Sequence, residues 1–192
     1  MISQSYYNIS RRISIRNVRA GNVIGGGDWS EDRIIPDLVN SYVLNKRVII
    51  RNPKSIRPWT FILDIIFGYL LIGLDCMLKR GSFNTYNLAP LQKKSFTVLE
   101  LANKFLNNFD AKNLISINNT LQFNEKKILK LSSGKIFKEL NWSNKTDFEE
   151  TVNLTAKWYK EVLSGKSPLK VTENCIKSYL NILNTKEKIY AS

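Results

Sequence analysis

Three arginines and a glycine-rich segment are the residues best suited to chemistry. The segment GNVIGGGDW, residues 21–29, holds four glycines in nine positions, so its backbone N–H groups could face an anionic ligand. Arg33 stands at the start of a predicted helix, and Arg51 and Arg57 flank a proline-containing turn. Because guanidinium groups pair closely with phosphate oxygens, this combination suits a diphosphate.

The same residues allow a purely structural interpretation. The glycines would then only shape a loop, and the arginines beside Asp28 or Asp32 would form surface ion pairs. The loop does not fit the G-x-G-x-x-G fingerprint, and no G-K-[ST] follows it. We therefore infer neither dinucleotide binding nor a P-loop from these glycines.

Composition excludes several kinds of site. The 192 residues include no histidine and only two cysteines, Cys76 and Cys175, so we expect no histidine-based triad and no metal site. So few cysteines are typical of a reducing cytoplasm. The formal net charge is +13, but the lysines occur singly or in pairs, which favours a solvated basic surface over a nucleic-acid interface. The length allows one domain or one and a half.

Short β-branched runs alternate with longer amphipathic stretches, which predicts an α/β protein. Ser30 or Asp32 is expected to cap the first helix, and Thr97 with Glu100 has capping-box spacing. The most apolar stretch, 61–77, is too short to span a bilayer and contains two aspartates, so we expect no membrane partner. Residues 1–10 show no targeting signal, so we expect a cytoplasmic protein. The predicted extended segments are 13–20, 48–51, 59–63, 85–88, 114–117 and 128–131, and the predicted helices are 34–44, 64–78, 97–107, 132–140, 147–163 and 172–183.

Seven motifs resemble those of CDP-glucose 4,6-dehydratases, which belong to the extended short-chain dehydrogenase/reductase superfamily and modify nucleotide-activated sugars. GGGDW together with RNP and RPW is the specific part of the signature, and the later motifs are shared more widely. The resemblance covers most of the chain. The motifs are RAGNVIGGGDW (19–29), DRIIPD (32–37), IRNPKSIRPW (50–59), GYLL (68–71), YNLAP (86–90), LKLSSGKIFKELNW (129–142) and TAKWYKEVLSG (155–165).

The resemblance implies substrate-binding roles for four residues. Asn22 looks like the asparagine that contacts the nucleotide-sugar beside the nicotinamide, and Arg33 begins a segment similar to the one that lines the nucleotide pocket. Arg57 of RPW resembles the arginine that grips the diphosphate, and Arg51 resembles a position near the base and ribose. Trp29 and Trp59 are interpreted as packing residues.

The resemblance also implies an incomplete architecture. Residues 1–30 would be the last part of a Rossmann-like core, and 31–192 a substrate-binding lobe interleaved with a return segment, about 57–90, to that core. The family's NAD-binding glycine motif, its Tyr-x-x-x-Lys pair and its dehydrating acids precede RAGN, so the N-terminal dinucleotide-binding half is expected to be absent. Neither Tyr6 nor Tyr7 has a lysine at the required spacing. Ser132 stands where relatives often carry an aspartate.

Two functions follow as expectations. The first is part of an enzyme that converts CDP-glucose to CDP-4-keto-6-deoxyglucose with loss of water in deoxysugar biosynthesis. This chain would hold the CDP-sugar but lack catalytic residues and bind no NAD alone. It would be inactive without a separately encoded N-terminal half. The family is typically homo-oligomeric. The alternative is a non-catalytic basic module that binds nucleic acid or another polyanion.

Overall fold

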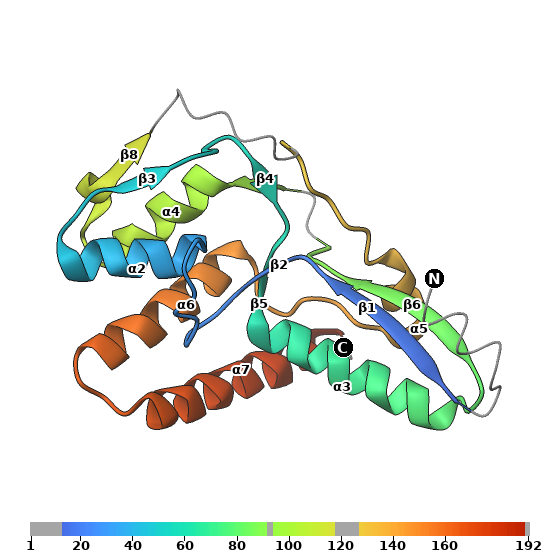
Figure 1. Cartoon of the computed structure of the whole chain (residues 1–192). Helices are drawn as coiled ribbons and strands as arrows, with labels where there is room; N and C mark the ends of the chain where they lie inside the picture. The colour runs from blue at the N-terminus through green and yellow to red at the C-terminus, as the bar shows by residue number, and fades with distance from the viewer. Residues whose placement is uncertain (1–12, 92–93, 118–126, 191–192) are drawn as a thin grey trace.

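The computed structural model describes residues 13–91, 94–117 and 127–190, which form an α/β fold of short strands and longer helices (Figure 1). The strands are β1 (Ile15–Ala20), β2 (Asn22–Ile24), β3 (Val48–Ile50), β4 (Ile56–Arg57), β5 (Trp59–Phe61), β6 (Phe83–Leu88), β7 (Phe96–Thr97) and β8 (Ile115–Ile117). The helices are α2 (Ile34–Leu44), α3 (Ile62–Leu78), α4 (Val98–Asn107), the short 3-10 helix η1 (Lys112–Leu114), α5 (Gly134–Leu140), α6 (Phe148–Leu163) and α7 (Pro168–Tyr190).

The described strands pair two by two. β1 runs parallel to β6, with Ile15 opposite Phe83 and Ala20 opposite Leu88. β2 runs parallel to β5 and β3 parallel to β8, whereas β4 and β7 are antiparallel. The chain leaves β1 at Ala20 and enters β2 at Asn22, so one extended segment contributes to two different sheets.

Two hydrophobic cores hold most of the buried side chains. The larger core lies among α2, α4 and α6, which gather on one side of Figure 1, and it includes Leu38, Phe105 and Tyr159. The smaller core lies between the β1–β6 pair and the helices α3 and α5, and it includes Tyr86 and Trp142. β2, β4 and β5 stand between these two groups of elements (Figure 1).

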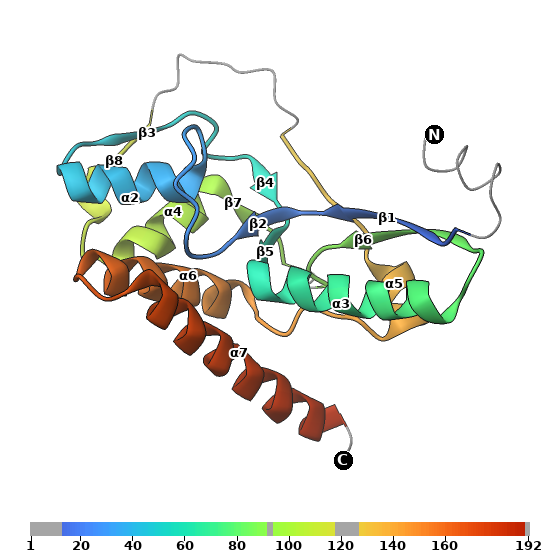
Figure 2. The same cartoon turned by 60° about the horizontal axis from the view of Figure 1, so that its bottom comes forward.

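The β1–β6 pair is covered on one side. α3 contacts β1, α5 contacts β6, and both helices lie on the same side of the pair (Figure 2). Arg16 of β1 reaches α3, where its Nε donates to the Asp75 carboxylate at 2.8 Å, and both side chains are buried. Among the elements that the structure describes, none covers the opposite side of this pair (Figure 2). Parallel sheets in proteins are normally covered on both faces.

Capping explains where two of the helices begin. α4 follows a capping box in which the Thr97 hydroxyl accepts from the backbone N–H of Glu100, and the Glu100 carboxylate accepts from the backbone N–H of Thr97. This confirms the spacing argument made from the sequence. Asp147 and Glu150 form a second capping box at the start of α6.

Several predicted boundaries are wrong. Arg33 is the N-cap residue of α2, without a side-chain cap, so neither Ser30 nor Asp32 caps it. The stretch 128–131 is not a strand, because only Ile128 forms an isolated bridge, to Ile56. β2 was missed because its three residues lie inside the segment interpreted as a glycine-rich loop. α3 begins at Ile62, α5 follows Ser133, and α7 runs well beyond the predicted 172–183.

No helix in the described ranges is both long and apolar enough for a membrane crossing.

Candidate functional site

A pocket of about 510 Å³ opens where β2 ends and α2 begins. It brings together three of the four predicted site residues, Asn22, Arg33 and Arg57. Arg51 is not one of its lining residues, but its guanidinium donates to the Asp32 carboxylate at 2.6 Å, and Asp32 does line the pocket. The remaining lining residues are Gly21, Val23, Ile24, Gly25, Asp28, Ile34, Ile35, Pro36, Trp59 and Val98.

Strand pairing places Asn22 and Arg57 in the same pocket. Asn22 is the first residue of β2 and lies opposite Trp59 of β5 in the parallel register. Arg57 ends β4, only two residues before Trp59, so the β2–β5 pairing brings Asn22 close to the segment that carries Arg57. The Arg57 guanidinium also donates to its neighbour's carbonyl, Ile56 O, at 3.0 Å.

Arg33 enters the pocket from the start of α2 and is paired with an acid. Its guanidinium lies 3.1 Å from the Asp28 carboxylate, and the Arg33 side chain is 66% exposed. Burial raises the pKa of Asp28, but the hydrogen bonds from Ser30 and Arg33 outweigh burial and hold that pKa below its usual range. Asp28 is therefore ionised at neutral pH and offsets part of the positive charge of Arg33.

The ion pairs that the structural interpretation expects are thus present. Arg33 pairs with Asp28 and Arg51 pairs with Asp32, and all four side chains are partly or largely exposed. Exposed pairs of this kind contribute only about 0.2–1 kcal/mol each. A diphosphate could replace either carboxylate as the partner of its arginine at small cost in free energy. These ion pairs are therefore compatible with anion binding.

Packing accounts for two glycines of the GNVIGGGDW segment. A Cβ on Gly25 would overlap the Ile62 side chain of α3, and a Cβ on Gly26 would overlap the Trp158 ring of α6. These glycines allow the loop to lie directly on two helices.

Tyr159 is a positioning residue that sequence reasoning missed. Its hydroxyl, on α6, donates to the backbone oxygen of Asp28 at 2.5 Å, and its ring packs edge-on against Trp29 at a centroid distance of 5.2 Å. Burial, followed by the charge of Asp28, raises the pKa of Tyr159 to about 12, so the phenol stays protonated and remains a donor. The sequence signal was weak, because one aromatic residue in a helix pattern usually indicates core packing.

The two tryptophans near the pocket differ in burial. Trp59 is 6% exposed and belongs to the larger core, as a packing residue should. Trp29 is 49% exposed and touches Tyr159 at the edge of the loop. Trp59 also has a buried indole Nε1 with no hydrogen-bond partner among the described residues.

Comparison with known proteins bears directly on the motifs. No protein-family model matches the chain. The chain is 34% identical over 172 residues to CDP-glucose 4,6-dehydratase of Salmonella typhimurium, an alignment that covers 88% of this chain and 47% of that protein. The chain therefore spans about half the length of this curated relative, and the resemblance inferred from the motifs is confirmed.

Solved structures share the fold at lower identity. dTDP-glucose 4,6-dehydratase from Bacillus anthracis in complex with NAD has a TM-score of 0.71 at 18% identity, over 84% of this chain and 49% of that one. DesIV, a dTDP-glucose 4,6-dehydratase from Streptomyces venezuelae, has a TM-score of 0.70 at 19% identity, over 88% and 50%. UDP-glucose-4-epimerase from Stenotrophomonas maltophila has a TM-score of 0.72 at 16% identity, over 86% and 54%. The predicted α/β fold is confirmed, and it matches about half of each of these chains.

Proposed function

We propose that this chain is the nucleotide-sugar-binding part of a CDP-glucose 4,6-dehydratase. The observation that carries the proposal is the 510 Å³ pocket, in which Asn22, Arg33 and Arg57 converge from separate segments of the chain. The 34% identity to the Salmonella enzyme supports the choice of a CDP-sugar. The complete enzyme would convert CDP-glucose to CDP-4-keto-6-deoxyglucose with loss of water.

Arg57 is the proposed diphosphate ligand. It enters from a strand whose backbone is held by pairing with β7, so its position does not depend on the exposed loop that carries Asp28 and Asp32. Arg33 would take the second phosphate after exchanging its partner Asp28, and Arg51 would approach the base and ribose after leaving Asp32. Asn22 would contact the sugar side of the ligand.

The chemical step is proposed to need residues outside these 192. Oxidation at the sugar C4 requires a bound nicotinamide and a general base. The sequence holds no G-x-G-x-x-G motif, and its Tyr-x-x-x-Lys spacing, Tyr42 to Lys46, follows the RAGN segment, whereas the family's pair precedes it. We propose that this chain alone holds substrate without turning it over. Turnover of CDP-glucose by the purified chain supplied with NAD would contradict this part of the proposal.

An N-terminal α/β half is the proposed partner, and two surfaces are suited to it. One is the side of β1–β6 that no described element covers (Figure 2). The other is the outward face of α3, which we name the α3 apolar face and which repeats at helical spacing. Its exposed members are Ile66, Tyr69, Leu70, Leu74, Met77 and Leu78. A partner that adds a parallel strand beside β1 and a helix against α3 would cover both surfaces.

Titration with CDP tests the binding proposal. We expect calorimetry to detect saturable CDP binding to the chain, and Arg57→Met to weaken it about tenfold, because a charge-assisted hydrogen bond contributes about 1.5–3 kcal/mol. Lys138→Met on α5 removes the same charge outside the pocket and should leave the affinity unchanged. Absence of CDP binding, or equal losses in the two variants, would overturn the proposal.

A further inference from the structure

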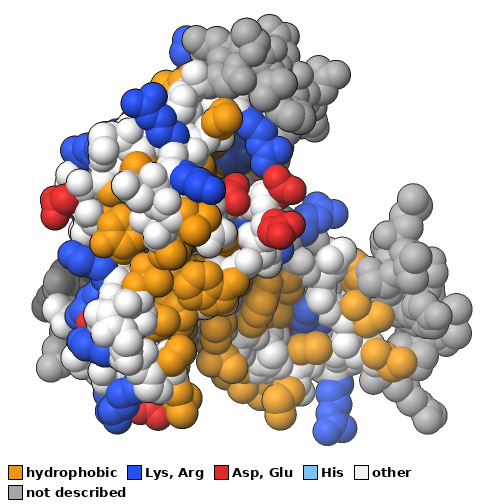
Figure 3. All heavy atoms as spheres, turned by 60° about the vertical axis from the view of Figure 1, so that its left-hand side comes forward, with side chains coloured by type: hydrophobic (Ala, Val, Ile, Leu, Met, Phe, Trp, Pro, Cys, Tyr) orange, Lys and Arg blue, Asp and Glu red, His pale blue; other side chains and the backbone are white. Residues whose placement is uncertain are grey.

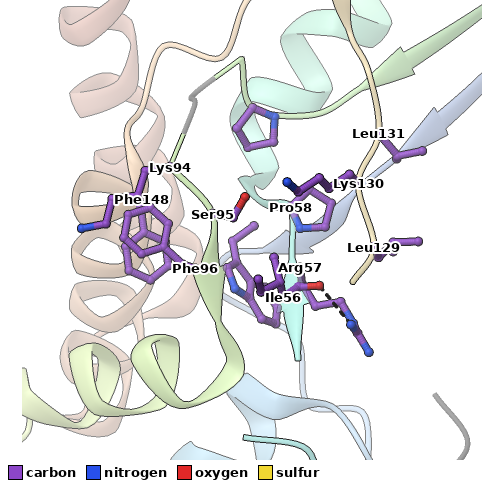
Figure 4. Close-up of a pocket in the computed structure, with 12 residues that line it drawn as sticks. Ile56, Arg57, Pro58, Lys94, Ser95, Phe96, Leu129, Lys130, Leu131 and Phe148 are labelled. Atoms are coloured by element: carbon purple, nitrogen blue, oxygen red, sulfur yellow. Dashed lines mark hydrogen bonds between the residues drawn. The ribbon is translucent and has the colours of Figure 1, made fainter. Parts of the chain in front are cut away.

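A second, smaller cleft adjoins the strands that carry Arg57 and Trp59 (Figure 4). Its volume is about 130 Å³. Arg57 and Trp59 line both this cleft and the pocket at Asn22, so the two cavities meet at β4 and the start of β5. The other lining residues are Ile56, Pro58, Pro90, Lys94, Ser95, Phe96, Leu129, Lys130, Leu131 and Phe148.

The cleft is positively charged on its described side. Arg57, Lys94 and Lys130 line it, and none of the described lining residues is acidic. Lys94 is held at the rim with its Nζ 5.0 Å from the centre of the Phe96 ring, which itself stacks on Phe148 at 3.7 Å. In Figure 4 the Lys130 side chain extends toward Pro58. In Figure 4 the charged ends of Lys94 and Arg57 lie on opposite sides of the group, so basic side chains border the cleft from different directions.

Trp59 supplies an independent observation that points to a ligand. Its side chain is 6% exposed, and its Nε1 is buried without a hydrogen-bond partner among the described residues. Leaving a buried N–H unpaired costs about 1–3 kcal/mol, so such donors are rarely left without an acceptor. Ser95 also points toward Pro58 in Figure 4 and offers a hydroxyl donor at the same cleft.

The size of the cleft restricts the acceptor. The cleft, at about 130 Å³, is smaller than the roughly 300–1,000 Å³ typical of pockets for drug-sized ligands. This size favours a small tetrahedral oxyanion over a nucleoside. An oxyanion also offers several acceptor oxygens, which match an indole N–H, a hydroxyl and an ammonium group at once.

We propose that this cleft is a second anion site, which takes a phosphate-type oxyanion separately from the nucleotide-sugar pocket. Trp59 Nε1, the Ser95 hydroxyl and Lys130 Nζ are its donors, and Lys94 contributes charge at the rim. The inference stands on the cleft itself and does not require that the larger pocket bind CDP. Arg57 and Trp59 line both cavities, so neither alone distinguishes them; Lys130 lines only this cleft and is the residue that the test changes.

The indole resonance of Trp59 provides the test. The chain has four tryptophans, and Trp59→Phe identifies which indole N–H signal belongs to Trp59 in a proton–nitrogen NMR spectrum. Titration of the ¹⁵N-labelled chain with inorganic phosphate should move that signal saturably. Lys130→Met should weaken the phosphate affinity about tenfold, whereas Lys138→Met, which removes an exposed lysine elsewhere, should not. The other three indole signals report whether each variant is folded.

Two outcomes would overturn the inference. One is a Trp59 signal that does not respond saturably to phosphate, or responds equally in the Lys130→Met and Lys138→Met variants. The other is displacement of phosphate by saturating CDP, which would make the cleft part of the nucleotide-sugar pocket. A phosphate response that persists in a chain unable to bind CDP would leave this inference standing while the proposed function fails.

Discussion

At the scale of single residues, Asp64 shows how contacts in the fold explain a polar residue in an apolar stretch of the sequence. Asp64 at the start of α3 interrupts an apolar run in the sequence and was interpreted only as an obstacle to membrane insertion. In the fold it is fully buried and accepts hydrogen bonds from the Tyr179 hydroxyl at 2.7 Å and from the Thr146 hydroxyl at 2.6 Å. It also accepts from the backbone N–H of Lys145. One carboxylate therefore joins α3, the segment before α6, and α7.

Gly26 gives a prediction at this scale. We expect Gly26→Ala to lower the free energy of unfolding by about 2 kcal/mol, because the new Cβ would overlap the Trp158 ring. Denaturant unfolding followed by tryptophan fluorescence measures the change.

Gly73→Ala is the matched control. Gly73 lies inside α3, and a Cβ there would have no described neighbour within 4 Å. The substitution should therefore raise stability by about 1 kcal/mol through helix propensity. Equal effects of the two alanines would show that Gly26 is not constrained by contact with Trp158.

The sequence indicated three residues that line one pocket, Asn22, Arg33 and Arg57, and it predicted the Thr97 capping box. The binding roles of the three residues stay predictions. Tyr159 and Asp64 were missed because their roles depend on contacts across a long sequence separation, which no local pattern contains. Tyr159 lies 131 positions from Asp28, and Asp64 lies 115 positions from Tyr179. The predicted bounds of α2 are correct, but its N-cap was misassigned, because Ser30 and Asp32 have the right chemistry for a cap whereas Arg33 occupies that position.

At the scale of elements, one buried ion pair joins β1 to α3, beside the apolar packing of the smaller core. Arg16 donates to Asp75, and Lys79 pairs with the same carboxylate at 2.7 Å from the exposed side. Burial raises the pKa of Asp75, but the hydrogen bonds and charges of Lys79 and Arg16 together hold it below its usual range. The smaller core is therefore stabilised by an interaction that requires an ionised carboxylate.

This pair predicts a pH dependence with a definite sign. Because the folded-state pKa of Asp75 is lowered, its contribution is present above the unfolded-state value of about 3.9 and is lost as the pH falls through the folded-state pKa. Asp75→Asn should lower stability at pH 7 by about 3 kcal/mol, since it leaves buried Arg16 without its counter-charge.

Unfolding free energies of the two proteins, measured from pH 7 to pH 2, provide the check. The difference between natural chain and variant should shrink toward acid pH. Both proteins contain the other titrating carboxyls, so the contributions of those groups cancel in the difference. Asp64 is one of them, and burial raises its pKa despite its hydrogen bonds. A difference that stays constant across this range would contradict the assignment.

For the whole molecule, charge and apolar surface point to different partners. On the face shown in Figure 3, Lys and Arg side chains are spread out rather than collected in one patch, and acidic side chains lie among them. This distribution does not favour the basic-module alternative. The exposed α3 apolar face is instead a continuous surface on one helix, which favours a protein partner.

Self-association of the isolated chain is the expected consequence. Light scattering during size-exclusion chromatography should show species larger than one chain, and Leu70→Lys with Met77→Lys should shift the distribution toward monomer without changing the unfolding midpoint. Both side chains are exposed, so their loss removes little packing. A natural chain that is monodisperse and monomeric would contradict this prediction.

The chain passes back and forth between the two cores, which restricts how the gene can recombine. β1 belongs to the smaller core, β2 and α2 to the larger, α3 and β6 to the smaller again, α4 to the larger, α5 to the smaller and α6 to the larger. No single cut separates the two cores into continuous pieces. Neither core can therefore be exchanged between genes, or evolve as a separate module, by one recombination event.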